Sequence, residues 1–357
     1  MKVGIIGCGN ISGIYLDNIS CMFNEISLAG VYDTVGSRAA EVAQKYSTRQ
    51  YNSLDEMLAC PDVDIVLNLT LPKSHFEINM KAIAAGKHVY TEKPLGVSYA
   101  EGKQQLAAAR AKGMRIGGAP DTFMGAGIKT CSKLIQDGHI GQPVGATAFM
   151  TSRGWESWHP DPAFYYQPGG GPVLDMGPYY LTALVSLLGP VGSVAAMGQA
   201  SFETRTITSQ PKFGQQIKVE VPTYVTSLLG FSSGAIGNFM ATFDVHAANL
   251  PIIEIYGSEG TLAVPDPNYF KGPVKLFRPD KGEFTEIPLI PGHSENSRGL
   301  GIANMAAAIK AGRPHEASGE LLLHVLEIME SIGSAAKEGR AVKLETTVET
   351  EPTYYNL

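Results

Sequence analysis

The first third of the chain alternates short apolar runs with longer segments of mixed polarity. Short apolar runs are typical of strands buried in a parallel sheet, and the segments between them have helical character. The runs predict strands at residues 3–6, 26–32, 63–69, 88–90 and 114–118, and helices at 38–46, 54–59, 76–85 and 99–112. This alternation predicts an α/β domain with a parallel sheet covered by helices on both faces.

From about residue 143 the pattern changes to strands separated by turn residues. We predict strands at residues 144–152, 194–202, 217–231, 235–244, 252–256, 260–264 and 342–344, and helices at 178–188, 303–311 and 319–338. Such a series is typical of an antiparallel sheet packed on helices, an α+β domain. We therefore expect two domains, 1–122 and 123–357, and leave open whether the last helices pack back on the first.

Composition and charge argue against several classes of protein. The chain has 357 residues, which is long for one core, and its net charge of −6 is unfavourable for binding nucleic acid or an anionic membrane. No apolar run reaches the roughly 18 residues of a membrane span. Four dispersed cysteines without CxxC spacing argue against a zinc cluster. With no export signal at its start, the chain is expected to be cytoplasmic, without nucleic-acid or membrane partners.

A glycine-rich turn follows the first predicted strand and precedes a helical segment. Gly7 permits a sharp strand-to-helix turn, and Gly9 lets a pyrophosphate approach the backbone. Ser12 takes the third position of the fingerprint, where a small residue allows close packing of helix on strand. We predict that Gly7, Gly9, Asn10, Ile11 and Ser12 bind a dinucleotide at the start of this helix.

An acidic residue ends the second predicted strand and bears on the choice of cofactor. The carboxylate of Asp33 is suited to accept hydrogen bonds from ribose hydroxyls and to repel a 2′-phosphate. Arg38 lies close enough in sequence to pair with such a phosphate, or it faces solvent on the next helix. The expected cofactor is therefore NAD, with NADP the less favoured alternative.

Two motifs carry side chains suited to proton transfer. Lys93 precedes Pro94 just after a predicted strand, and a partly desolvated lysine can polarise or protonate a carbonyl or hydroxyl. Asp175 and Tyr179 are four residues apart, so they share one face of a helix, and Asp175 is also a suitable helix N-cap. The alternatives are a surface lysine, and a cap followed by a core tyrosine.

The loop at 153–167 contains both tryptophans of the chain. The rings of Trp155 and Trp158 are suited to pack on the C–H face of a sugar, and His159 is suited to bind its hydroxyls or to carry a proton. The alternative is that the rings only anchor a long loop on the sheet.

Several motifs together make the chain similar, along essentially its whole length, to the glucose–fructose oxidoreductase / inositol dehydrogenase / MocA-like family. They are the glycine turn, Thr70-x-Pro72-x-x-His75, Glu92-Lys93-Pro94, the run Gly169 to Gly177, the turn Tyr256 to Thr261, and the segment from Ser318 to Arg340. The resemblance implies a Rossmann domain followed by an α+β domain with a large, mostly antiparallel open sheet, which commonly forms dimers or tetramers. It also implies hydride transfer between a nicotinamide and a sugar, cyclitol or related alcohol.

The resemblance assigns roles by position. Lys93 is expected to bind substrate and assist proton transfer, and Asp175 to orient the reacting hydroxyl. Tyr179 stands where the family usually has its catalytic histidine. Residues expected to line the cofactor are Thr70, Leu71, Pro72, His75, Glu92 and Pro94. In the turn 119–123 the commoner Asn and Arg are replaced, and Asp121 is expected to contact substrate instead.

Two other functions remain open from the sequence. One is a glycosidase of the same family that uses NAD as a transient oxidant, and the other is a nonenzymatic NAD-binding regulator.

Overall fold

The computed structural model describes residues 1–349, and the chain divides into two compact units. Unit 1 comprises Met1–Met124 and Glu295–Leu326, and unit 2 comprises Gly125–Ser294 and the described chain from Glu327 onward. The described chain therefore passes from one unit to the other after residues 124, 294 and 326.

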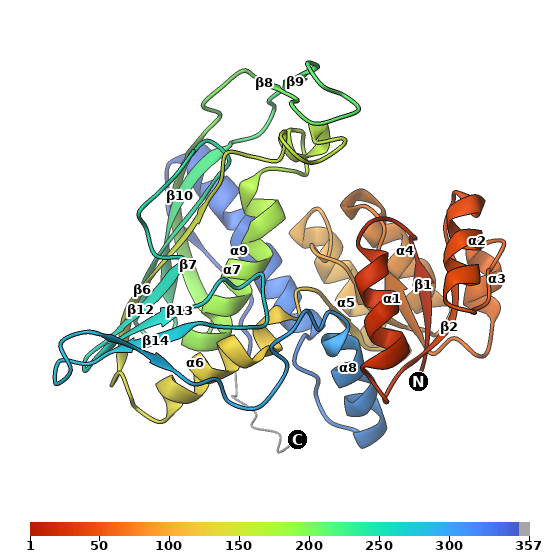
Figure 1. Cartoon of the computed structure of the whole chain (residues 1–357), viewed down its shortest axis with the longest axis horizontal. Helices are drawn as coiled ribbons and strands as arrows, with labels where there is room; N and C mark the ends of the chain where they lie inside the picture. The colour runs from red at the N-terminus through yellow and green to blue at the C-terminus, as the bar shows by residue number, and fades with distance from the viewer. Residues whose placement is uncertain (350–357) are drawn as a thin grey trace. The chain divides into compact units, whose positions relative to one another are not determined.

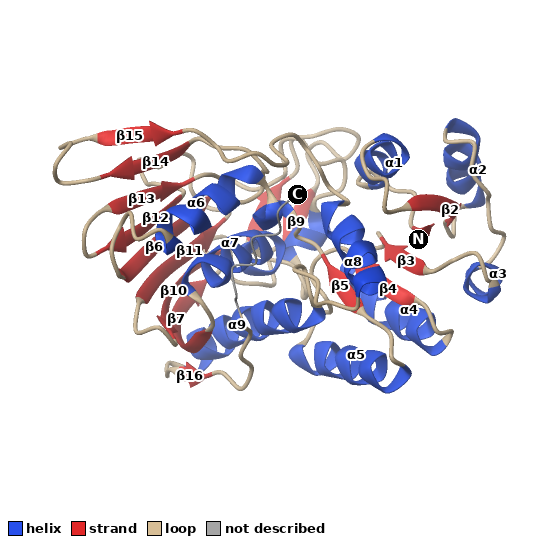
Figure 2. Ribbon diagram, turned by 90° about the horizontal axis from the view of Figure 1, so that it is seen from below, coloured by secondary structure: helices blue, strands red, loops and turns tan. Residues whose placement is uncertain are grey.

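Unit 1 contains a five-stranded parallel sheet in the order β2-β1-β3-β4-β5. Figure 2 shows α1 on one side of this sheet and the mutually contacting helices α4 and α5 on the other. Its elements are β1 (Lys2–Ile6), α1 (Ser12–Cys21), β2 (Ser27–Tyr32), α2 (Gly36–Lys45), α3 (Leu54–Ala59), β3 (Ile65–Asn68), α4 (Pro72–Ala84), β4 (His88–Thr91), α5 (Tyr99–Lys112), β5 (Ile116–Gly118), a 3-10 turn (Thr122–Met124) and α8 (Leu300–Ala311). The predicted Rossmann architecture is confirmed.

Two helices of unit 1, α3 and α5, have local capping residues at their ends. The Ser53 and Ser98 hydroxyls accept backbone N–H bonds and cap α3 and α5. Gly113 ends α5 in the left-handed conformation at φ 66°, which glycine adopts without a side-chain clash. Because these signals are local, the predicted bounds of α3 and α5 agree with the structure.

Unit 2 is built on a nine-stranded sheet in the order β15-β14-β13-β12-β6-β11-β10-β7-β16. Only the β11–β6 pair within it is parallel, so the predicted mostly antiparallel sheet is confirmed. Its strands are β6 (Pro143–Thr151), β7 (Val191–Gln199), β10 (Tyr224–Phe231), β11 (Ile236–Thr242), β12 (Ile253–Gly257), β13 (Thr261–Val264), β14 (Val274–Phe277), β15 (Phe284–Ile287) and β16 (Val342–Lys343).

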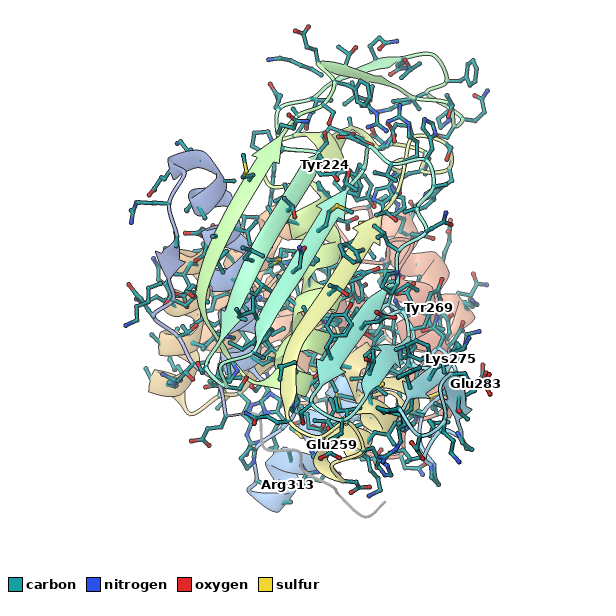
Figure 3. The ribbon with its side chains drawn as sticks, turned by 90° about the vertical axis from the view of Figure 1, so that its left-hand side faces the viewer. Tyr224, Glu259, Tyr269, Lys275, Glu283 and Arg313 are labelled. Atoms are coloured by element: carbon teal, nitrogen blue, oxygen red, sulfur yellow. The ribbon has the colours of Figure 1, made fainter. Side chains whose placement is uncertain are left out.

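Helices α6 (Ala126–Gln136) and α7 (Pro172–Leu188) pack on one face of the nine-stranded sheet (Figure 1). Figure 3 shows the opposite face, over which no helix of the described part of unit 2 lies. A separate hairpin, β8 (Thr204–Thr206) and β9 (Gln216–Lys218), stands beside the loop that precedes α7, and this loop contains a 3-10 turn (Ala163–Tyr166). Helix α9 (Gly319–Glu338) begins in unit 1 and continues into unit 2.

Two sequence predictions for unit 2 are wrong, and some of its elements were not predicted. The predicted helix at 178–188 begins six residues earlier, at Pro172, with Gly171 as its N-cap, so Asp175 is not the cap. The predicted strand at 217–231 is two strands, because residues 219–223 turn the chain between β9 and β10. Helix α6 and strands β8, β14 and β15 were not predicted.

Within residues 1–349, no helix combines the length and the apolar character that a membrane span needs.

Candidate active site

The glycine turn of unit 1 is tightly packed at Gly7 and open at Gly9. Gly7 has φ 97°, and a Cβ there would lie 2.9 Å from the Leu69 carbonyl oxygen, so only glycine fits. A Cβ on Gly9 would meet no heavy atom within 4 Å. The chain then enters α1 at Ser12, whose Oγ donates a 2.7 Å hydrogen bond to the Gly9 carbonyl oxygen. The open side of the turn is therefore beside Gly9.

The carboxylate of Asp33 is held against this turn. Its Oδ2 accepts a 2.8 Å hydrogen bond from the Cys8 backbone N–H, and its Oδ1 accepts a 2.7 Å bond from the Val35 N–H. Both bonds orient the carboxylate at the carboxyl end of β2. Arg38 is exposed in the first turn of α2.

These features fit a dinucleotide. The N-cap residue of α1 is Ile11, whose apolar side chain cannot accept hydrogen bonds from the first N–H groups of the helix. An anion at that end gains those N–H groups and the positive end of the helix dipole. Asn10 and Ile11 are exposed beside Gly9. No group of three or more metal-ligating side chains occurs among the residues that the structure describes.

The segment after β3 is tied to the segment after β4 through His75. Its Nδ1 lies 2.7 Å from the Pro94 carbonyl oxygen and its Nε2 lies 2.9 Å from the Thr70 carbonyl oxygen. The imidazole is fully buried, and burial lowers its pKa. Leu71 is 68% exposed at the start of α4, where Pro72 is the first residue. His75 therefore holds the turns at Thr70 and Pro94 at a fixed separation. Both turns are predicted to line the cofactor, and Leu71 lies exposed on the first of them.

The turn after β4 carries Glu92, Lys93 and Pro94. Glu92 Oε2 accepts a 3.0 Å bond from the Lys93 backbone N–H, and Oε1 accepts a 2.8 Å bond from the hydroxyl of Tyr15 in α1. Tyr15 is fully buried. The helix that follows the glycine turn and the segment that bears Lys93 are therefore joined by a direct hydrogen bond.

Asp121 is buried in unit 1. It is 1% exposed, and its Oδ2 accepts hydrogen bonds of 2.9 Å and 3.0 Å from the Gly299 and Gly301 N–H groups at the start of α8. Burial raises the pKa of this carboxyl to about 6. The predicted contact with substrate requires an exposed carboxylate, whereas this placement favours an anchor for α8.

Asp175 and Tyr179 lie in α7 of unit 2, one turn apart on the same face. Asp175 is in the first turn, where a negative charge is favourable to the helix dipole. Its Oδ2 accepts a 2.8 Å hydrogen bond from Trp155 Nε1. Tyr179 is 9% exposed. The structure therefore brings three predicted site residues of unit 2 together: Trp155, Asp175 and Tyr179.

The rings of the loop before α7 form one edge-to-face cluster. Trp155 contacts Trp158, Tyr165 and Phe243 with centroids 5.9, 6.2 and 5.4 Å away. His159 makes similar contacts with Trp158 at 5.4 Å and with Tyr165 at 5.4 Å, and its Nδ1 accepts a bond from the Asp161 N–H. Trp158 is 57% exposed, so this part of the cluster presents an aromatic surface to solvent.

Sequence reasoning missed the residues that hold this loop and the Lys93 turn. Arg205 of β8 pairs with Glu156 and Asp244, each almost wholly buried. Tyr15 reaches Glu92 over 77 residues of sequence. A tyrosine at a core-facing helix position and an arginine in a short strand carry no local signal of their partners. Only the three-dimensional structure brings these pairs together.

The strand–turn–helix geometry, the oriented Asp33 and the strand order define unit 1 as a nucleotide-binding domain of the Rossmann class. Residues 1–118 match the family described as "Oxidoreductase family, NAD-binding Rossmann fold", and residues 128–263 match the "GFO/IDH/MocA C-terminal domain". The chain belongs to the Gfo/Idh/MocA family of oxidoreductases.

Known relatives resemble the chain along most of its length. The 1,5-anhydro-D-fructose reductase of Ensifer adhaerens is 28% identical over 325 residues, covering 87% of this chain and 90% of that protein. An NAD-binding oxidoreductase of Klebsiella pneumoniae has the same fold with a TM-score of 0.84, at 24% identity over 98% of this chain and 99% of that one. Levoglucosan dehydrogenase in complex with NADH and L-sorbose has a TM-score of 0.83, at 21% identity over 97% and 99%.

Proposed function

We propose that the protein is an NAD-dependent dehydrogenase or reductase that acts on a CH–OH group of a sugar, cyclitol or related alcohol. The observation that carries the proposal is the orientation of Asp33 by the backbone of the glycine turn. A carboxylate fixed there accepts bonds from a ribose diol and repels a 2′-phosphate, which favours NAD over NADP. The sugar class is supported by relatives named for anhydrofructose and levoglucosan.

The chain's own residues have distinct tasks in this proposal. The turn at Gly7–Ser12, the strand end at Asp33, and the segments bearing Thr70 and Glu92 bind the cofactor. Bound nicotinamide accepts or supplies the hydride. Lys93 and Tyr179 exchange a proton with the substrate oxygen, and Asp175 orients the reacting hydroxyl by accepting its hydrogen bond. Trp158 and His159 offer an aromatic and a polar contact to the sugar.

The first test is NADH absorbance with purified protein, NAD or NADP, and a panel of sugars, cyclitols and sugar lactones. The native protein is expected to reduce NAD with one polyol class, and Lys93→Ala and Tyr179→Phe to lose about 10²-fold or more in kcat. Lys81→Ala, which removes an exposed lysine, and Tyr180→Phe, which removes the neighbouring hydroxyl, are the matched controls and retain activity.

Other outcomes favour the alternatives. NAD binding without net reduction, together with cleavage of aryl glycosides, supports a glycosidase that uses NAD transiently. NAD binding with no turnover of either substrate class supports a regulator and overturns the proposed reaction.

We also propose that the helix-free face of the nine-stranded sheet joins two copies of the chain into a dimer, or a tetramer built from dimers. Met197 on β7, Leu228 on β10 and Ile236 on β11 are 77%, 53% and 63% exposed on that face. Large exposed apolar side chains gathered on one face are typical of protein interfaces. Light scattering should give at least twice the monomer mass, and Leu228→Lys with Ile236→Glu should give the monomer mass.

A further inference from the structure

We propose that the buried ion network of Arg205 is a positioning device for the reaction: it anchors the loop before α7 so that the Trp155 indole N–H stays on the Asp175 carboxylate. The inference rests on the proposed function for its catalytic consequence. Its structural part concerns unit 2 alone and can be tested without a substrate.

Arg205 contacts the chain on both sides of Trp155. Its Nε lies 2.5 Å from Glu156 Oε1, directly after Trp155, and its Nη2 donates to the Arg153 carbonyl oxygen, two residues before Trp155. Its Nη1 and Nη2 also donate to the Phe243 carbonyl oxygen at 3.1 Å and 3.2 Å. The Phe243 ring packs edge-on against Trp155. One guanidinium therefore holds both the backbone and the packing partner of this indole.

Neutral hydroxyl groups donate to the remaining oxygen of each carboxylate in the network. Glu156 Oε2 accepts a 2.6 Å bond from the Tyr166 hydroxyl, and Asp244 Oδ2 accepts a 2.6 Å bond from the Thr223 hydroxyl. Burial raises the pKa of Tyr166, which keeps its hydroxyl protonated as a donor. Arg205 and its two carboxylates are 5–8% exposed, where hydrogen-bonded ion pairs are geometrically specific and little screened by salt. Such a network restricts the loop to one arrangement.

Trp155 is the link from this network to the proposed chemistry. Asp175 Oδ2 accepts a 2.8 Å hydrogen bond from the indole N–H. A residue outside α7 therefore orients this carboxylate. Orientation of a reacting group within about 10–20° is what catalysis requires of the residues that support a site. Trp155 and Arg205 are therefore positioning residues, one in contact with Asp175 and the other acting through the loop.

The two tryptophans make the structural part measurable. Trp158→Phe leaves Trp155 as the single tryptophan of the full chain, so emission and acrylamide quenching report on this residue. In that background Asp175→Leu, which cannot accept the indole N–H, is expected to shift the emission, whereas Asp175→Asn keeps an acceptor and restores it. Arg205→Met is expected to increase quenching, because the loop loses its anchor.

A second pair of variants, at Glu156, tests the same anchor if Arg205→Met does not fold. Glu156→Leu removes the carboxylate, whereas Glu156→Gln retains an acceptor for the guanidinium and is expected to recover the native emission. The matched control is Lys212→Met. Lys212 pairs with Asp161 at 2.7 Å between the same two segments, but both side chains are exposed, so its loss should leave emission and turnover unchanged.

The catalytic part of the proposal predicts that kcat falls while NAD affinity does not change. Trp155→Phe and Glu156→Leu are expected to lower kcat about tenfold, the usual loss for one hydrogen bond to a charged group, with NAD affinity unchanged. Native kcat in Trp155→Phe, or emission indifferent to Asp175→Leu, overturns the positioning role. If the native protein turns over no polyol, the proposed function fails, and the emission results alone decide whether the network holds Trp155 on Asp175.

Discussion

The hydroxyl of Tyr15, fully buried in α1, donates a 2.8 Å hydrogen bond to Glu92, the residue before Lys93. One side chain therefore connects the helix that begins at the glycine turn with the segment proposed to carry the proton-transferring lysine. The bond lies within unit 1 and is partly buried: the Tyr15 side chain has no exposed surface, and Glu92 is half-buried.

Tyr15→Phe removes only this donor. We expect the free energy of unfolding to fall by about 1.5–3 kcal/mol, the usual value for a hydrogen bond to a charged group. Urea denaturation measures the change. The matched control is Tyr46→Phe, which removes an exposed hydroxyl 2.7 Å from Asp17 Oδ1 and should change stability by less than about 0.5 kcal/mol. Equal losses in the two variants would contradict the importance of burial.

The two glycines of the nucleotide turn should respond oppositely to the same substitution. Gly7→Ala forces a side chain into φ 97° and against the Leu69 carbonyl, so we expect a loss of about 1–3 kcal/mol in stability. Gly9→Ala meets no protein atom, so stability should remain within about 0.5 kcal/mol while NAD affinity falls about tenfold or more. Thermal denaturation and calorimetric NAD titration separate the effects, and undiminished NAD affinity in Gly9→Ala would place the cofactor elsewhere.

The buried carboxyl of Asp121 should make stability depend on pH. Burial raises its pKa to about 6, above that of an unfolded chain, so the folded state binds the proton more tightly. This contribution to stability is complete below about pH 4 and is lost as pH rises through about 6. Two pKa units correspond to about 3 kcal/mol.

Asp121→Asn removes that dependence but retains an oxygen for the Gly299 and Gly301 N–H groups. We expect the stability of the variant relative to native protein to rise by about 3 kcal/mol between pH 4 and pH 7. Urea denaturation across that range measures it. Asp137→Asn, at an exposed carboxylate, is the control, and a parallel pH profile for the Asp121 variant and the native protein would refute the prediction.

Asp33 should decide between the two nicotinamide cofactors. Asp33→Ser removes the charge that repels a 2′-phosphate, and we expect the ratio of NADP to NAD affinity to rise about 10- to 100-fold. Adding Arg38→Ala should reverse part of that gain if Arg38 reaches the phosphate. Parallel titrations with both cofactors give the ratio, and an unchanged ratio would show that the carboxylate lies away from the ribose.

The sequence predicted the elements whose signals are local. The parallel strands of unit 1 are continuous apolar runs, so their type could be inferred. Helices α3 and α5 carry serine caps, so their bounds could be inferred as well. The start of α7 could not be inferred, because Pro172 and Pro178 are equally suited to a first helical turn and Gly171 caps with its backbone alone. Strand β15 is exposed at three of its four positions and has no alternating pattern to reveal it.

In the candidate site, too, the residues linked by short spacing could be predicted and the contacts between distant residues could not. The roles of Gly7, Gly9 and Asp33 follow from spacing within 33 residues, and the structure gives them a geometry that fits a dinucleotide. The bond from Gly299 to Asp121 spans 178 residues, and that from Arg205 to Asp244 spans 39. No periodicity or motif records such pairs, because they depend on how distant segments return to the same core.

The division of unit 1 into two stretches of sequence has a consequence for synthesis on the ribosome. The α8 N–H groups that bind Asp121 are made long after β5, and the unit is complete only when residue 326 has been added. At about 5–20 residues per second, that interval lasts roughly 10–40 s after residue 124. The nascent Rossmann sheet therefore lacks α8 and the first part of α9 while the whole of the intervening unit 2 segment emerges.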